Sequence, residues 1–116
     1  MEKVTGVGGI FFKAEDAPKL RDWYRDNLGI DVDPQWGGAM MGDVVWSIFP
    51  TTSKHFDKPC MINYRVSDLD AMLAQLRAAG ATVDEKVTDD DFGRFGWVTD
   101  PEGNRIELWQ PAATDK

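Results

Sequence analysis

The chain has 116 residues, with 20 Asp or Glu against 13 Lys or Arg, so its formal net charge is −7. Hydrophobic residues make up 42% of it, which supports a packed core and excludes a disordered, weakly hydrophobic chain. The acidic balance and the scattered cations argue against nucleic acid as a partner. We expect residues 1–116 to form a single domain, because domains commonly span about 100–150 residues.

The chain is also short of metal-binding side chains. It has one cysteine, Cys60, and one histidine, His55, which excludes an internal disulfide, a Cys-based zinc site and any motif with several His. No apolar run approaches the roughly 20 residues that cross a bilayer, and the N-terminal residues lack a signal-peptide pattern. These features predict a cytoplasmic protein without a membrane partner.

The first half of the chain predicts one strand, one helix and then short strands. Residues 4–13 are typical of a strand, Asp16 is placed to cap a helix, and Gly29 is placed to stop it. Three further strands are expected over 30–33, 39–41 and 44–49. The polar stretch 51–59 is interpreted as a linker, with His55 on the surface; the alternative is a general base that reaches over a cavity.

The second half repeats this order of elements. A strand is expected over 60–66, then a helix that Ser67 and Asp70 begin as a capping box and Gly80 ends. The helix carries an apolar stripe of Leu69, Met72, Leu73 and Leu76. Further strands are expected over 83–87, 94–99 and 105–109, the last two joined by the turn 100–104.

Superposing the sequence on itself shows an internal repeat. A shift of 52 residues places Asp16 on Asp68 and Leu20 on Met72, and a shift of 60 places Trp46 on Ile106. Two βαβββ modules, about 4–50 and 60–111, therefore predict an α+β fold whose curved sheet carries its helices outside. The alternative is a generic α+β domain with accidental similarity between its halves.

Three segments resemble the vicinal oxygen chelate superfamily. Residues 93–109 (GRFGWVTDPEGNRIELW) resemble its closing motif, and residues 23–30 (WYRDNLGI) and 68–80 (DLDAMLAQLRAAG) resemble the helices of its two modules. This superfamily includes glyoxalase I, bleomycin- and fosfomycin-resistance proteins and extradiol dioxygenases. The resemblance implies a half-open barrel of mixed sheet around a cavity, and a homodimer.

In metal-using members, up to four side chains from the first and last strand of each module hold a divalent ion. The resemblance places these positions at Gly9, Ser47, Met61 and Glu107. Glycine has no donor, serine is a poor neutral ligand, and a thioether suits Cu(I) rather than the divalent ions of this family. We therefore expect no metal site and no cofactor, with Gly9 leaving open space in the cavity.

Strand alternation predicts which side chains face the cavity and which face the helices. Ile10 and Ile62 are expected under the helix layer. The predicted ligand-binding and catalytic residues on the inward side are Phe11, Lys13, Ser47, Phe49, Asn63, Arg65, Arg105, Glu107 and Trp109. The alternative is that Glu107 pairs with Arg65 or Arg105 while the aromatic rings fill a closed core.

Aromatic walls with sparse polar groups are typical of a small-molecule pocket. The favoured function is therefore that of a bleomycin-resistance-like protein, which binds a small molecule in the cavity without metal. The alternative is an enzyme, a lyase or isomerase of the lactoylglutathione lyase type or a relative, with Glu107 as metal ligand or general acid–base. A third possibility is an interaction module without a ligand. The excess of cations among the inward residues leaves anionic or neutral aromatic ligands open.

Overall fold

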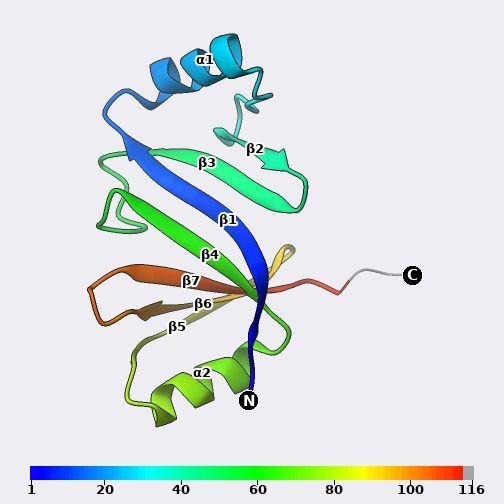
Figure 1. The fold of residues 1–116 in the computed structure, drawn as a ribbon, viewed down its shortest axis with the longest axis vertical. Helices are drawn as coiled ribbons and strands as arrows, with labels where there is room; N and C mark the ends of the chain where they lie inside the picture. The colour runs from blue at the N-terminus through cyan, green and yellow to red at the C-terminus, as the bar shows by residue number, and fades with distance from the viewer. Residues whose placement is uncertain (114–116) are drawn as a thin grey trace.

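The computed structural model describes residues 1–113, and Figure 1 shows their arrangement. Seven strands form one mixed sheet in the order β2-β3-β1-β4-β7-β6-β5. The strands are β1 (Val4–Ala14), β2 (Gly38–Met41), β3 (Val44–Pro50), β4 (Cys60–Val66), β5 (Thr82–Asp90), β6 (Gly93–Thr99) and β7 (Arg105–Pro111). The helices are α1 (Ala17–Leu28) and α2 (Leu69–Ala78). Neither helix of the described part is long and apolar enough to cross a membrane.

The internal repeat is confirmed by the pairing of the strands. Within the first module β1 runs parallel to β3 with Phe11 opposite Ser47, and within the second β4 runs parallel to β7 with Asn63 opposite Glu107. Shifts of 52 and 60 residues carry the first pair onto the second. The modules join where β1 pairs antiparallel with β4, so one sheet runs through both.

The first module has one strand fewer than the sequence predicts. Residues 30–33 are not a strand, because their backbone groups bond locally: the Val32 N–H donates to the carbonyl of Ile30, and the Asp33 N–H to that of Gly38. Val32 is buried in the core under α1. The apolar pattern of residues 30–33 therefore reflects the packing of a loop. The first module has the element order βαββ.

The helix ends confirm one predicted cap and correct the other. The Asp16 carboxylate accepts from the Lys19 N–H, and Gly29 ends α1 with φ 67°, as expected. In α2, however, Asp68 takes the N-cap position and accepts from the Ala71 N–H at 3.0 Å, so the predicted Ser67 cap is wrong. Asp68 is the repeat counterpart of Asp16, and both modules therefore start their helix in the same way.

Each helix covers the outer face of its own module only. One apolar core lies under α1 around Trp46 and Ile48, and another lies under α2 around Leu73 and Leu108. The helices stand at opposite ends of the molecule in Figure 1. Ile10 and Ile62, which pair between the helices, are therefore 43% and 36% exposed, contrary to the prediction that both lie under the helix layer.

A third apolar cluster occupies the inner face, the side of the sheet opposite the helices. It contains Phe11, Met61 and Trp97 from the strands, and Phe56 from the segment between β3 and β4. Phe56 is 1% exposed. The segment predicted to be a polar linker therefore crosses the inner face and contributes a core residue to it.

Candidate functional site

Glu107 lies at the middle of the inner face in a row that crosses four strands. Gly9 on β1 is opposite Asn63 on β4, which is opposite Glu107 on β7, which is opposite Trp97 on β6. Paired residues point to the same side of a sheet. The predicted inward orientation of Asn63 and Glu107 is therefore confirmed.

Two neutral donors hold the Glu107 carboxylate. The Asn63 amide donates to Oε1 at 2.7 Å, and the Trp97 indole N–H donates to Oε2 at 2.9 Å. Glu107 is 5% exposed and Asn63 is 2% exposed. Because each carboxylate oxygen accepts a hydrogen bond, the side chain of Glu107 is held in one orientation.

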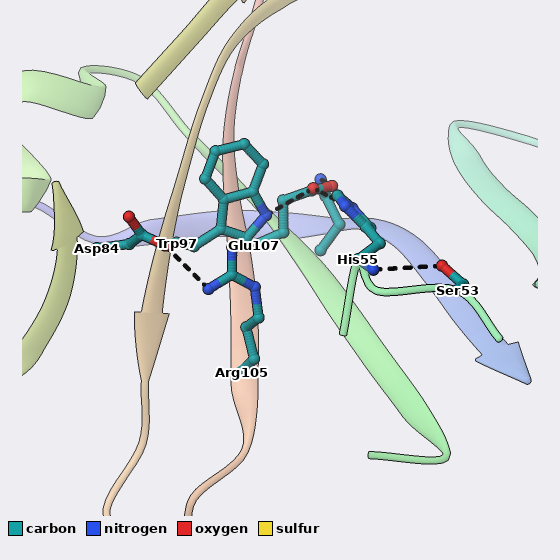
Figure 2. A network of polar contacts seen from close by, with 7 residues as sticks. Ser53, His55, Asp84, Trp97, Arg105 and Glu107 are labelled. Atoms are coloured by element: carbon teal, nitrogen blue, oxygen red, sulfur yellow. Dashed lines mark hydrogen bonds and ion pairs between the residues drawn. The ribbon is translucent and has the colours of Figure 1, made fainter. Parts of the chain in front are cut away.

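His55 completes the group, as Figure 2 shows. Its Nε2 lies 3.0 Å from Glu107 Oε2, although the two residues are 52 positions apart. The imidazole stacks on Phe49 with ring centroids 5.8 Å apart, and the His55 backbone N–H donates to Ser53 Oγ. The expectation that His55 is a simple surface residue is therefore wrong, and the alternative that it reaches over the cavity matches its position.

The linker is held in place by Lys13, which was predicted to bind ligand. Its Nζ donates to the Ser53 carbonyl at 3.0 Å and lies 5.1 Å from the centroid of the Phe56 ring. Its backbone N–H donates to the carbonyl of Pro59. Lys13 therefore anchors the linker that positions His55.

A pocket of about 540 Å³ lies beside Glu107, between the linker and the strands β5, β6 and β7. Its lining residues are Lys54, His55, Lys86, Thr88, Asp90, Phe95, Trp97, Arg105 and Glu107. Most ligand pockets of small-molecule-binding proteins have volumes of roughly 300–1,000 Å³ and combine apolar walls with a few polar groups. This pocket has that size and that composition.

Arg105 and Asp84 form an ion pair next to Trp97, also drawn in Figure 2. Arg105 Nη1 lies 3.2 Å from Asp84 Oδ2, and its guanidinium carbon lies 5.2 Å from the Trp97 ring centroid. The Lys86 backbone N–H and the Arg105 guanidinium donate to the Asp84 carboxylate and lower its pKa from 3.8. The pair positions Arg105 along the pocket wall.

Of the nine residues predicted to face the cavity, Arg105 and Glu107 line this pocket. Asn63 supports Glu107 from behind, and Phe11, Ser47 and Phe49 pack on the inner face of the first module.

The remaining two predicted residues form a stack beside the pocket. The Arg65 guanidinium carbon lies 4.7 Å from the Trp109 ring centroid, and Trp109 stacks on Phe95 at 5.7 Å with an interplanar angle of 4°. Arg65 also donates to the Asp43 carbonyl, and Trp109 to that of Phe92.

The space expected above Gly9 is filled. A Cβ atom at Gly9 would lie 2.7 Å from Cζ of Phe11, so the ring of Phe11 covers this position. The prediction of open cavity space there is wrong, because an aromatic side chain two residues along the same strand folds over the glycine. The alternative of a core closed by aromatic rings holds for the first module.

Several pocket residues were not predicted. Phe95 and Trp97 alternate along β6 on the face opposite that of Val98, so strand periodicity was enough to find them. Thr88 and Asp90 lie opposite Phe95 and Gly93 in the pairing of β5 with β6, whereas Lys86 lies at the register shift between Val83 and Val87. Lys54 and His55 depend on the path of the linker, and only the neighbouring Phe56 in a polar stretch hinted at its burial.

A mixed sheet of two repeated modules, with a polar group on the inner face of one of them, defines a glyoxalase-like α+β domain. The chain belongs to the glyoxalase-like domain family, which matches residues 9–109, and its fold is that of the vicinal oxygen chelate superfamily. No curated protein matches the chain.

Similar solved structures share the fold at low sequence identity. Methylmalonyl-CoA epimerase from Mycobacterium tuberculosis is 23% identical, with a TM-score of 0.68 and coverage of 95% of this chain and 90% of that one. The Streptomyces coelicolor enzyme in complex with 2-nitronate-propionyl-CoA is 18% identical, with a TM-score of 0.69 and coverage of 96% and 100%. A catechol 2,3-dioxygenase is 22% identical at a TM-score of 0.67, with coverage of 97% of this chain and 41% of the dioxygenase.

Proposed function

We propose that this protein binds a small organic molecule in the pocket beside Glu107, without a protein-bound metal ion. The observation that carries the proposal is the pocket itself, where apolar walls from Phe95 and Trp97 meet polar side chains over a buried, oriented carboxylate. The similar epimerase structures, one of them described in complex with methylmalonyl-CoA, support a small organic ligand.

The donor set supports the absence of the family's metal ion. Gly9 offers no ligand atom, Ser47 is buried beside Phe11, and Met61 belongs to the apolar cluster. Both oxygens of Glu107 already accept hydrogen bonds. Among residues 1–113, no group of three or more His, Cys, Asp or Glu side chains is placed to hold a metal, whereas catalytic zinc sites usually use three protein ligands.

The test combines elemental analysis with a thermal-shift screen of organic compounds and divalent metals. We expect less than stoichiometric metal in the purified protein and a raised Tm with some organic compounds, since a ligand at 100 times its Kd stabilises by about 2.7 kcal/mol. Binding at the pocket is verified by an NMR shift of the Trp97 indole N–H. Stoichiometric Ni, Zn, Mn or Fe, or the lack of any organic hit at the pocket, contradicts the proposal.

A second candidate function is proton transfer, which the contact between His55 and Glu107 favours. A histidine oriented by a buried carboxylate is a common arrangement of a general base, and His55 Nδ1 has no hydrogen-bond partner within residues 1–113. Ligands from the screen are incubated with the protein in D₂O, and an enzyme is expected to exchange an acidic C–H proton for deuterium. Loss of exchange in Glu107→Gln supports this function, and no exchange with any ligand argues for binding alone.

We also propose a homodimer, as the resemblance implies. Val7, Ile10 and Ile62 are exposed together on the outer face between the helices, where a second copy would cover them. Sedimentation at micromolar concentration is expected to give twice the monomer mass, and a monomer contradicts this proposal.

A further inference from the structure

The pocket beside Glu107 has the opposite charge balance to the chain as a whole. Its lining includes three cationic side chains, Lys54, Lys86 and Arg105, against two acidic ones, Asp90 and Glu107. The whole chain, in contrast, has a net charge of −7. At physiological ionic strength the Debye length is about 8 Å, so a bound ligand interacts mainly with the groups that line the pocket.

Two of these cations form no ion pair in the described chain, although Lys86 helps to lower the pKa of the Asp84 carboxylate. Lys54 and Lys86 take part in none of the ion pairs among residues 1–113, and Lys86 Nζ lies 6.0 Å from the Trp97 ring centroid. Arg105 is paired with Asp84 through Nη1, while its buried Nε has no partner in the described chain. Cationic donors on the linker, β5 and β7 therefore surround one space.

The buried acidic group of the pocket, the Glu107 carboxylate, already accepts hydrogen bonds from the protein. Glu107 is buried and accepts from Asn63 and Trp97, with His55 in contact with the same oxygen as Trp97. Asp90 lies at the exposed end of β5, where its carboxylate accepts from the Phe92 N–H. A cationic ligand would therefore lie close to Lys54, Lys86 and Arg105. The carboxylates that could attract it already accept hydrogen bonds from the protein.

The apolar part of the pocket has a flat wall. Phe95 stacks on Trp109 through one side of its ring and lines the pocket. A planar ligand group gains most from such a wall, because aromatic rings prefer offset-stacked or edge-to-face contacts at centroid distances of 4.5–7 Å. Trp97 is less accessible to a ligand ring because Arg105 and Lys86 both lie close to it.

We propose that the ligand is a small planar organic anion, such as an aromatic carboxylate, whose charged group lies among Lys54, Lys86 and Arg105 while its flat part packs against Phe95. The proposal rests on the proposed small-molecule binding at this pocket and specifies the ligand's chemical class.

The experiment compares benzoate, benzamide and benzylamine, which carry one ring and a negative, neutral or positive group. Binding is followed by NMR shifts of the Trp97 indole N–H and the His55 ring in the full chain. We expect benzoate to bind at least about 5-fold more tightly than benzamide, and its affinity to fall as salt is raised.

Variants assign the charge effect to the pocket. Lys54→Gln and Lys86→Gln are each expected to lower the affinity for benzoate about 2- to 5-fold, since exposed ion pairs have effects of this size. The ratio of benzoate to benzamide affinity should fall by the same factor. Lys3→Gln is the matched control, because Lys3 is exposed and outside the pocket lining. Unfolding curves are the check that all three variants fold, which we expect because the substituted side chains are exposed.

The outcomes separate this inference from the proposed function. Three results would contradict an anionic ligand but not a small-molecule pocket. They are equal binding of benzoate and benzamide, tighter binding of benzylamine, and no effect of either lysine substitution. The lack of any pocket shift with benzoate at millimolar concentration also overturns it. In that case the neutral and cationic compounds of the thermal-shift screen decide whether the pocket binds a small molecule at all.

Discussion

The inner faces of the two modules place different chemistry on the same backbone frame. At equivalent register positions, the first module has Phe11 beside Ser47, and the second has Asn63 beside Glu107. In the first module the Phe11 ring covers Gly9, and the face is packed with apolar groups. In the second, an amide and an indole orient a buried carboxylate. The two modules therefore share a backbone frame, while the polar site lies in the second module.

The linker between the modules connects these two faces. Phe56 packs among Phe11, Met61 and Trp97, whereas the preceding residue, His55, contacts Glu107. Phe56 therefore packs in the apolar cluster, while the adjacent His55 belongs to the polar group around Glu107.

Removing the shared core residue is expected to have the largest effect. Phe56→Ala should lower the free energy of unfolding by about 3–5 kcal/mol, because Phe56 is 1% exposed and its loss leaves a cavity at the centre of the inner face. Urea denaturation measures this loss. The control is Phe92→Ala, where the ring is 72% exposed and a change within about 0.5 kcal/mol is expected. Similar losses for both variants would mean that the linker does not pack on the inner face.

Equivalent positions in the two modules should respond differently to alanine. Glu107→Ala is expected to cost about 2–4 kcal/mol, because it leaves the buried Asn63 and Trp97 donors unpaired. Ser47→Ala should cost about 1 kcal/mol or less, since it removes one hydroxyl from a buried position and leaves no donor to a buried carboxylate unpaired. Chemical denaturation of both variants gives the comparison, and equal costs would contradict the assignment of the polar site to the second module.

Gly9 and Met61 occupy equivalent positions in the two modules, and substitutions there should differ in cost. Gly9→Ala should cost about 1–3 kcal/mol, because the new Cβ would stand 2.7 Å from Phe11 Cζ. Met61→Leu, which nearly conserves volume, should cost less than about 1.5 kcal/mol. Thermal unfolding of both variants is the measurement. A neutral Gly9→Ala would show that the Phe11 ring does not cover this position.

The smallest effect is expected from the ion pair at the pocket wall. The folded-state pKa of Asp84 is lowered, so its stabilising contribution is present at neutral pH and is lost as the pH falls below about 3.8. Asp84→Asn should therefore cost less than about 1 kcal/mol at pH 7, since both partners are partly exposed, and the difference should shrink in acid. Unfolding measured from pH 7 to pH 3 checks the sign, and a difference that grows in acid would contradict it.

Most of the framework followed from local sequence patterns. The strand over 60–66 and the helix starts depend on alternation and on residues close in sequence, although Asp68 rather than the predicted Ser67 caps the second helix. The inward position of Glu107 followed from the alternation of β7. The strand predicted over 30–33 failed because Val32 satisfies an apolar pattern by packing in a loop under α1.

The repeat, the order of most elements and the side of the sheet that holds Glu107 can be predicted from the sequence, because periodicity and capping act over a few residues. Three features require the folded chain: the contact of His55 with Glu107, the cover of Gly9 by Phe11, and the grouping of Lys54, Lys86 and Arg105 around one pocket. These contacts depend on the path of the 51–59 linker and on pairing between distant strands. Burial of Phe56 and the need of a buried carboxylate for donors stabilise that path, and neither is encoded in a local pattern.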